Sequence, residues 1–165
     1  MVEASALPWT SKRSVLGLLG WLALCLAAAL VGSWFPPGAW YAQLDKPTWT
    51  PPAAMFGPVW TILYFLMGVA AWLVWRQDGF SAEATIALSL FLVQLALNAF
   101  WSIIFFGWQE PGLAFVELVV LWGAIVLTLI FFWRRNALAG LLLVPYLAWV
   151  TFAGVLNFAI WQLNA

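Results

Sequence analysis

Five long apolar stretches take up most of this 165-residue sequence. They run from about 15 to 35, 55 to 75, 84 to 106, 113 to 133 and 138 to 161. About 20 apolar residues in a helix cross the hydrocarbon core of a bilayer. Only 7% of the residues are charged, against about 25% in soluble domains, which excludes a soluble fold. The sequence predicts an all-α membrane protein, with a bundle of five transmembrane helices as one domain (15–165) after an N-terminal segment (1–14).

The start of the chain allows a second interpretation. Lys12 and Arg13 precede the first apolar run, and three consecutive alanines (27–29) resemble the small residues before a signal-peptide cleavage site. The apolar run continues beyond these alanines to Trp34. This continuation favours a membrane-spanning helix over a cleaved signal peptide.

The positions of the cations predict an orientation. The N-terminal segment, the turn after residue 75 and the turn after residue 133 fall on one side of a five-helix bundle. They carry Lys12, Arg13, Arg76, Arg134 and Arg135, which leaves Lys46 for the other side. Cytoplasmic loops of membrane proteins carry the excess of Lys and Arg. We therefore expect a cytoplasmic N-terminus and the long loop 36–54 on the opposite side of an integral, multi-pass protein.

The loop 36–54 is rich in proline and aromatic residues. Pro47, Pro51 and Pro52 fix φ and remove backbone donors, so this stretch is not helix interior. Flexible linkers are usually polar, whereas this loop carries Trp40, Tyr41 and Trp49. The pattern predicts a rigid lid at the mouth of the second helix, with Pro58 in the first turn of that helix.

Three of the predicted helices carry polar and aromatic side chains at a spacing of four residues. The three sets are Phe56, Trp60 and Tyr64; Gln94, Asn98 and Ser102; and Trp149, Ala153 and Asn157, with Tyr146 about one turn before the last set. Residues four apart share one helix face. Amides at membrane depth bond a neighbouring helix or a ligand. Each amide alone favours helix-to-helix bonding, whereas three such faces beneath one aromatic loop favour a pocket.

Several classes of chemistry lack their usual residues. The chain has no histidine, one cysteine (Cys25, within an apolar run) and a formal net charge of zero without a basic block. These features disfavour a metal site, acid–base catalysis by histidine and nucleic acid as a partner. Glu117 is the one carboxylate within a predicted span. We expect it either to lie near the membrane surface, where it is solvated, or to be held protonated, and we assign it no role.

Three motifs together resemble one family. They are W-Y-x-x-L-x-K-P-x-W-x-P-P followed by F-x-P-V-W-T-x-L-Y, then Q-L-x-L-N-x-x-W-S, and finally P-Y-L-x-W-x-x-F-A-x-x-L-N, in order between about Trp34 and Asn164. In this respect the chain is similar to the tryptophan-rich sensory protein family, TspO/MBR, whose mitochondrial members are called translocator protein or peripheral-type benzodiazepine receptor. The resemblance implies a five-helix membrane protein, usually a homodimer, that binds porphyrins such as protoporphyrin IX and, in some members, sterols and benzodiazepine-site drugs.

The resemblance also implies a set of ligand-binding residues. They are Tyr41, Trp60, Tyr64, Asn98, Trp149, Ala153 and Asn157. Trp60 and Trp149 match tryptophans linked, in some bacterial members, with light-dependent degradation of protoporphyrin. In that case an excited porphyrin, with oxygen, would react with a nearby indole, and these two residues would be catalytic.

Three functions are therefore open. We expect a tetrapyrrole-binding protein that takes part in porphyrin sensing, transport or regulation, with porphyrin as ligand and no cofactor. The alternatives are a light-dependent porphyrin-degrading enzyme and a transporter of porphyrins, sterols or other small apolar ligands. The absence of histidine favours a metal-free porphyrin over haem. No cation follows Tyr146, so the sterol motif found near the end of the fifth helix in animal members is incomplete here.

Overall fold

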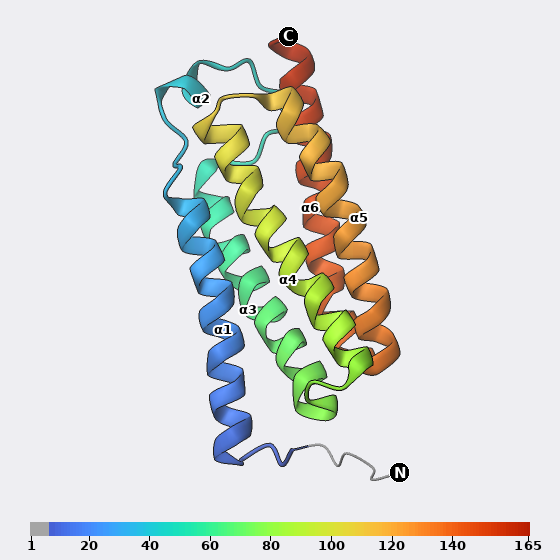
Figure 1. The fold of residues 1–165 in the computed structure, drawn as a ribbon. Coiled ribbons are helices and arrows are strands. Elements are labelled where there is room, and N and C mark those ends of the chain that lie inside the picture. The colour runs from blue at the N-terminus through green and yellow to red at the C-terminus, as the bar shows by residue number, and fades with distance from the viewer. Residues whose placement is uncertain (1–6) are drawn as a thin grey trace.

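The computed structural model describes residues 7–165 as a bundle of long helices (Figure 1). The long helices are α1 (Lys12–Ser33), α3 (Ala53–Asp78), α4 (Ala82–Ser102), α5 (Pro111–Arg135) and α6 (Ala137–Leu163), and α4 continues into a π-helical turn, η1 (Ile103–Gly107). With η1 counted as part of α4, five helices are long and apolar enough to cross a membrane, and the described residues contain no strand. The predicted all-α, five-helix membrane fold is confirmed.

The helices begin one to three residues earlier than the apolar runs suggested, and polar side chains cap α1, α4 and α6. Ser11 accepts a hydrogen bond from the Ser14 amide at 3.2 Å, and Asn136 accepts one from the Ala139 amide at 3.1 Å. Such caps satisfy amides that have no partner within the helix. The predicted helix ends differ from the observed ones by one to three residues, and the placement of Pro58 in the first turn is wrong. Helix α1 ends at Ser33 instead of residue 35, and Pro58 lies in the second turn of α3 because that helix begins at Ala53.

The segment between α1 and α3, residues 34–52, is not irregular throughout. It contains the short helix α2 (Ala39–Gln43), while Pro47, Pro51 and Pro52 lie outside helices, as predicted. We call residues 34–52 the α1–α3 segment. Figure 1 shows it at the end of the bundle where α1 and α6 end. Its action as a lid remains a prediction.

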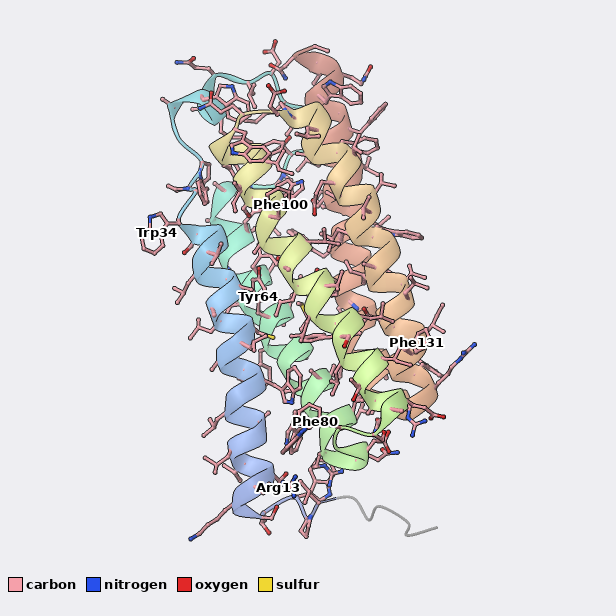
Figure 2. The ribbon with its side chains drawn as sticks, viewed as in Figure 1. Arg13, Trp34, Tyr64, Phe80, Phe100 and Phe131 are labelled. Atoms are coloured by element: carbon pink, nitrogen blue, oxygen red, sulfur yellow. The ribbon has the colours of Figure 1, made fainter. Side chains whose placement is uncertain are left out.

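The interior of the bundle is apolar and closely packed, and much of its outer surface is apolar as well. Phe91 of α4 stacks on Phe132 of α5, with ring centroids 5.8 Å apart. Leu16, Ile62 and Val116 are more than half exposed, and Figure 2 shows Trp34 pointing away from the bundle. Scattered apolar residues occur on every protein surface, but a wide apolar exterior on long helices is suited to lipid. The chain is an integral, multi-pass membrane protein.

The positive charges gather at one end of the bundle. The start of α1 and the ends of α3 and α5 lie together there (Figure 1), and Lys46 belongs to the α1–α3 segment at the other end. Arg135 forms an ion pair with Asp78 at 2.8 Å and a second with Glu83. This arrangement joins the ends of α3 and α5 to the start of α4. The cytoplasmic location of this end remains a prediction.

Two glycines allow a test of the helix packing. A Cβ atom at Gly140 would lie 2.8 Å from Cβ and 2.9 Å from Cα of Trp133, whereas nothing lies within 4 Å of one at Gly123. We expect Gly140→Ala to lower the free energy of unfolding by about 1–3 kcal/mol, because the α5–α6 junction must shift. Gly123→Ala should leave it unchanged or raise it by up to about 1 kcal/mol, since alanine favours helix. Thermal unfolding in detergent measures both, and equal effects would contradict the packing described.

Candidate functional site

Three polar side chains from three helices form one hydrogen-bonded chain inside the bundle. The Tyr64 hydroxyl of α3 donates to Asn98 Oδ1 of α4 at 2.5 Å, and Asn98 Nδ2 donates to the Tyr146 hydroxyl of α6 at 3.0 Å. Asn98 is 5% exposed and Tyr146 is fully buried. We call Tyr64, Asn98 and Tyr146 the polar centre. It satisfies one buried amide by means of two phenols, which fixes the relative positions of α3, α4 and α6.

Trp60 covers one side of the polar centre. Its ring centroid lies 5.5 Å from that of Tyr64 and 6.3 Å from that of Tyr146. Trp60 and Tyr64 are four residues apart on α3, which places both rings on one face. The predicted faces of α3 and α4 therefore meet here, and α6 contributes Tyr146.

Trp149 continues the aromatic wall along α6. Its ring contacts Phe56 of α3, with centroids 5.8 Å apart, and Phe152, with centroids 5.5 Å apart. Its indole Nε1 is buried and has no hydrogen-bond partner among the described residues. Ala153, one turn further along α6, packs against the main hydrophobic core. A buried indole N–H without an acceptor is uncommon, because such groups usually find a partner.

Asn157 bonds residues of α4 and α5 that lie outside the polar centre. Its Oδ1 accepts a hydrogen bond from Trp101 Nε1 at 3.0 Å, and its Nδ2 donates to the Pro111 carbonyl at 2.8 Å. The side chain thus joins α6 to α4 and to the first turn of α5. Asn157 therefore bonds neighbouring helices, which is one of the two roles that the sequence allowed for such an amide. Its oxygen and its nitrogen both have partners.

Tyr41 lies against the π-helical turn, apart from the polar centre. Its ring contacts Phe105 and Phe106 of η1, with centroids 6.1 and 5.5 Å away, and Lys46 Nζ lies 4.7 Å from its centroid. Burial raises the pKa of the Tyr41 phenol above its ordinary value. The phenol therefore stays protonated near neutral pH. Of the predicted site residues, the structure joins Trp60, Tyr64 and Asn98 through the polar centre, but it gives Tyr41 and Asn157 other neighbours.

Tyr146 lies about one turn before the predicted α6 set and was not predicted as a site residue. In the structure Tyr146 is the partner that completes the polar centre. It lies three residues before Trp149, and this spacing also brings side chains to the same side of a helix. A spacing of four residues identified Trp149, Ala153 and Asn157 on α6. A spacing of three residues would have added Tyr146. Trp101 was missed in the same way, three residues after Asn98.

Two further polar side chains are buried without partners. Gln94 is 1% exposed and Glu117 is 8% exposed, and neither side chain has a hydrogen-bond partner among the described residues. The first alternative for Glu117, a solvated position near the membrane surface, is therefore wrong. No three His, Cys, Asp or Glu side chains within residues 7–165 gather where they could hold a metal ion.

Two open grooves lie on the bundle, and no residue of the predicted site lines either of them. One, with a volume of about 430 Å³, runs between α5 and α6 and is lined by residues that include Phe115, Trp122 and Phe158. The other, of about 310 Å³, runs between α1 and α4 beside Leu24 and Leu92. At the polar centre the aromatic rings pack directly on one another. A ligand that bound there would have to separate these rings.

The polar centre can be tested by its effect on stability. Asn98→Leu should lower the free energy of unfolding by about 1–3 kcal/mol, because it leaves the hydroxyls of Tyr64 and Tyr146 without their partner. Adding Tyr64→Phe to that variant should recover part of the loss, since it removes one of the stranded hydroxyls. Denaturation of the single and double variants in detergent measures this. Losses that simply add would contradict a hydrogen-bonded unit.

The sequence is similar to those of known proteins along most of its length. Residues 21–162 match the TspO/MBR family. The chain is 46% identical to the tryptophan-rich protein TspO of Chlorobaculum tepidum over 156 residues, which cover 93% of this chain and 99% of that protein. It is 44% identical to the translocator protein of Homo sapiens over 138 residues (81% and 82%), and 40% identical to the tryptophan-rich sensory protein of Cereibacter sphaeroides over 146 residues (88% and 90%). The chain belongs to the TspO/MBR family.

Proposed function

We propose that this membrane protein binds a metal-free tetrapyrrole such as protoporphyrin IX at the polar centre, for porphyrin sensing, transport or regulation. The observation that carries the proposal is the meeting of Tyr64, Asn98 and Tyr146 beneath Trp60, with hydrogen bonds of 2.5 and 3.0 Å. Aromatic faces stack on a flat π-system, and hydroxyl and amide groups bond polar atoms at its edge. A ring-shaped ligand with polar substituents would use both features.

The buried groups without partners support the same proposal. The Trp149 indole N–H and the Gln94 amide could donate to acceptors of a ligand, and the Glu117 carboxyl could accept from a donor. Groups of this kind cost free energy in an apolar interior unless something bonds them. A tetrapyrrole offers both ring N–H donors and carboxylate acceptors. A ligand with one hydroxyl group, such as a sterol, would satisfy fewer of them.

Binding can be tested in the dark. Purified protein is titrated with protoporphyrin IX while tryptophan fluorescence is followed. We expect saturable quenching in the wild-type chain, and dissociation constants raised about three- to tenfold in Trp60→Phe, Trp149→Phe and Asn98→Ala, because each removes one stacking or polar contact. Trp133→Phe, at an exposed position near the end of α5, is the matched control. Non-saturable quenching that none of the three substitutions changes would overturn the proposal.

Light-dependent degradation of the bound porphyrin is the second candidate. Its support is the position of Trp60, whose indole lies against two hydrogen-bonded phenols. An excited porphyrin together with oxygen would react with such an indole. Illumination of the same samples, with porphyrin absorbance followed over time, separates the two functions. Loss of absorbance that depends on Trp60 or Trp149 and on oxygen would favour the enzyme, and stable absorbance with intact binding would favour a sensor or carrier.

A further inference from the structure

Asn164, which ends α6, is bonded to the backbone of the α1–α3 segment. The Asp45 amide N–H donates to Asn164 Oδ1 at 2.9 Å, and Asn164 Nδ2 donates to the Asp45 carbonyl at 2.9 Å. Nδ2 also donates to the Ile160 carbonyl in the last turn of α6, at 2.7 Å. The side chain therefore holds both backbone groups of one residue that lies 119 positions earlier in the chain.

This pair differs from the other contacts of the α1–α3 segment. Lys46 donates to the Ala42 and Leu44 carbonyls, and Thr50 to that of Pro47, so these hydrogen bonds stay within the segment. Among the described residues, the side-chain hydrogen bonds that tie the segment to a long helix are those of Asn164. They require an amide, because a carboxylate lacks the donor.

The other contacts of the segment with the bundle are apolar, and many of them are aromatic. Trp40 and Tyr41 lie on Phe105, with centroids 5.8 and 6.1 Å away, and Trp49 lies on Phe152, 5.9 Å away. Phe152 in turn contacts Trp149 of the proposed site. Apolar burial is non-directional, whereas hydrogen bonds depend steeply on distance and angle. The Asn164 pair is thus the directional contact that fixes where the segment rests on α6.

We propose that Asn164 is a positioning residue for the ligand site, which holds Asp45 on α6 and thereby sets how fast a ligand enters and leaves beneath the α1–α3 segment. The inference rests on the proposed function. The hydrogen bonds must break for the segment to lift and can form again once a ligand is inside. Their loss therefore lowers the barrier in both directions and leaves the affinity nearly unchanged.

Stopped-flow mixing with protoporphyrin IX tests this directly. Asn164→Ala should raise the association and dissociation rate constants together, by about tenfold, because two exposed hydrogen bonds are lost. Asn164→Asp should raise both rate constants at least as much, because a carboxylate oxygen would replace Nδ2 and face the Asp45 and Ile160 carbonyls. Gln162→Ala, an exposed neighbour on α6, is the control and should match the wild-type rates. A lower unfolding temperature with unchanged rates would show a purely structural role and overturn the inference.

A disulfide between residues 45 and 164 is the opposite test, because it keeps the α1–α3 segment from lifting off α6. Asp45→Cys and Asn164→Cys are combined with Cys25→Ala, since Cys25 is the one native cysteine. Oxidation should slow porphyrin uptake at least tenfold, and a reductant should restore it, while each single cysteine variant should be insensitive to both. A formed disulfide with unchanged uptake would also overturn the inference.

The two proposals fail in different ways. If the wild-type chain shows no saturable porphyrin binding, the proposed function fails, and this inference fails with it. If binding is saturable but its rates are the same in Asn164→Ala and after oxidation of the cysteine pair, only the role of Asn164 fails. Hydrogen exchange gives a readout without ligand, because the Asp45 amide should exchange faster in Asn164→Ala than in Gln162→Ala.

Discussion

The structure depends on the need of every polar group inside a bilayer to find a partner within the protein. Lipid offers no hydrogen bonds, so a buried amide or hydroxyl must be bonded by a neighbouring helix. Asn98 meets this need through Tyr64 and Tyr146, and Asn157 meets it through Trp101 and the Pro111 carbonyl. These two asparagines connect α6 with α3, α4 and α5. They give direction to helix contacts that are mostly apolar.

Three buried polar groups in the bundle lack such a partner among the described residues. The side chains of Gln94 and Glu117 and the Nε1 atom of Trp149 are buried and have no hydrogen-bond partner within residues 7–165. Such exceptions in a native interior call for an explanation, and a ligand or bound water is the usual one. They come from three different helices, α4, α5 and α6. The interior therefore combines a satisfied network, which sets the fold, with buried polar groups that have no partner in the described part of the chain.

Much of the fold follows from the sequence, because hydrophobicity over 20 residues predicts a membrane helix strongly. The site is predicted less completely. Spacing shows which residues share a face of one helix, and it correctly grouped Trp60 with Tyr64. It does not show how far that helix is rotated against its neighbours, and this rotation decides that Asn98 bonds Tyr146 while Asn157 bonds Trp101. The contact of Tyr41 with η1 also could not be predicted, since no residue pattern indicates a π-helical turn after Ser102.

The π-helical turn η1 contains an additional residue compared with an α-helix. In η1 the Trp108 amide bonds the Ile103 carbonyl, a span of five residues instead of the four of an α-helix. The turn therefore holds one residue more than a regular helix would need, directly after the part of α4 that carries Asn98. Removal of one residue between 103 and 107 could be absorbed by a return to α-helix. It would rotate the faces of Phe105 and Phe106 relative to Trp40 and Tyr41, while Asn98 kept its place. The turn thus separates the position of Asn98 in α4 from the contacts that Phe105 and Phe106 make with the α1–α3 segment.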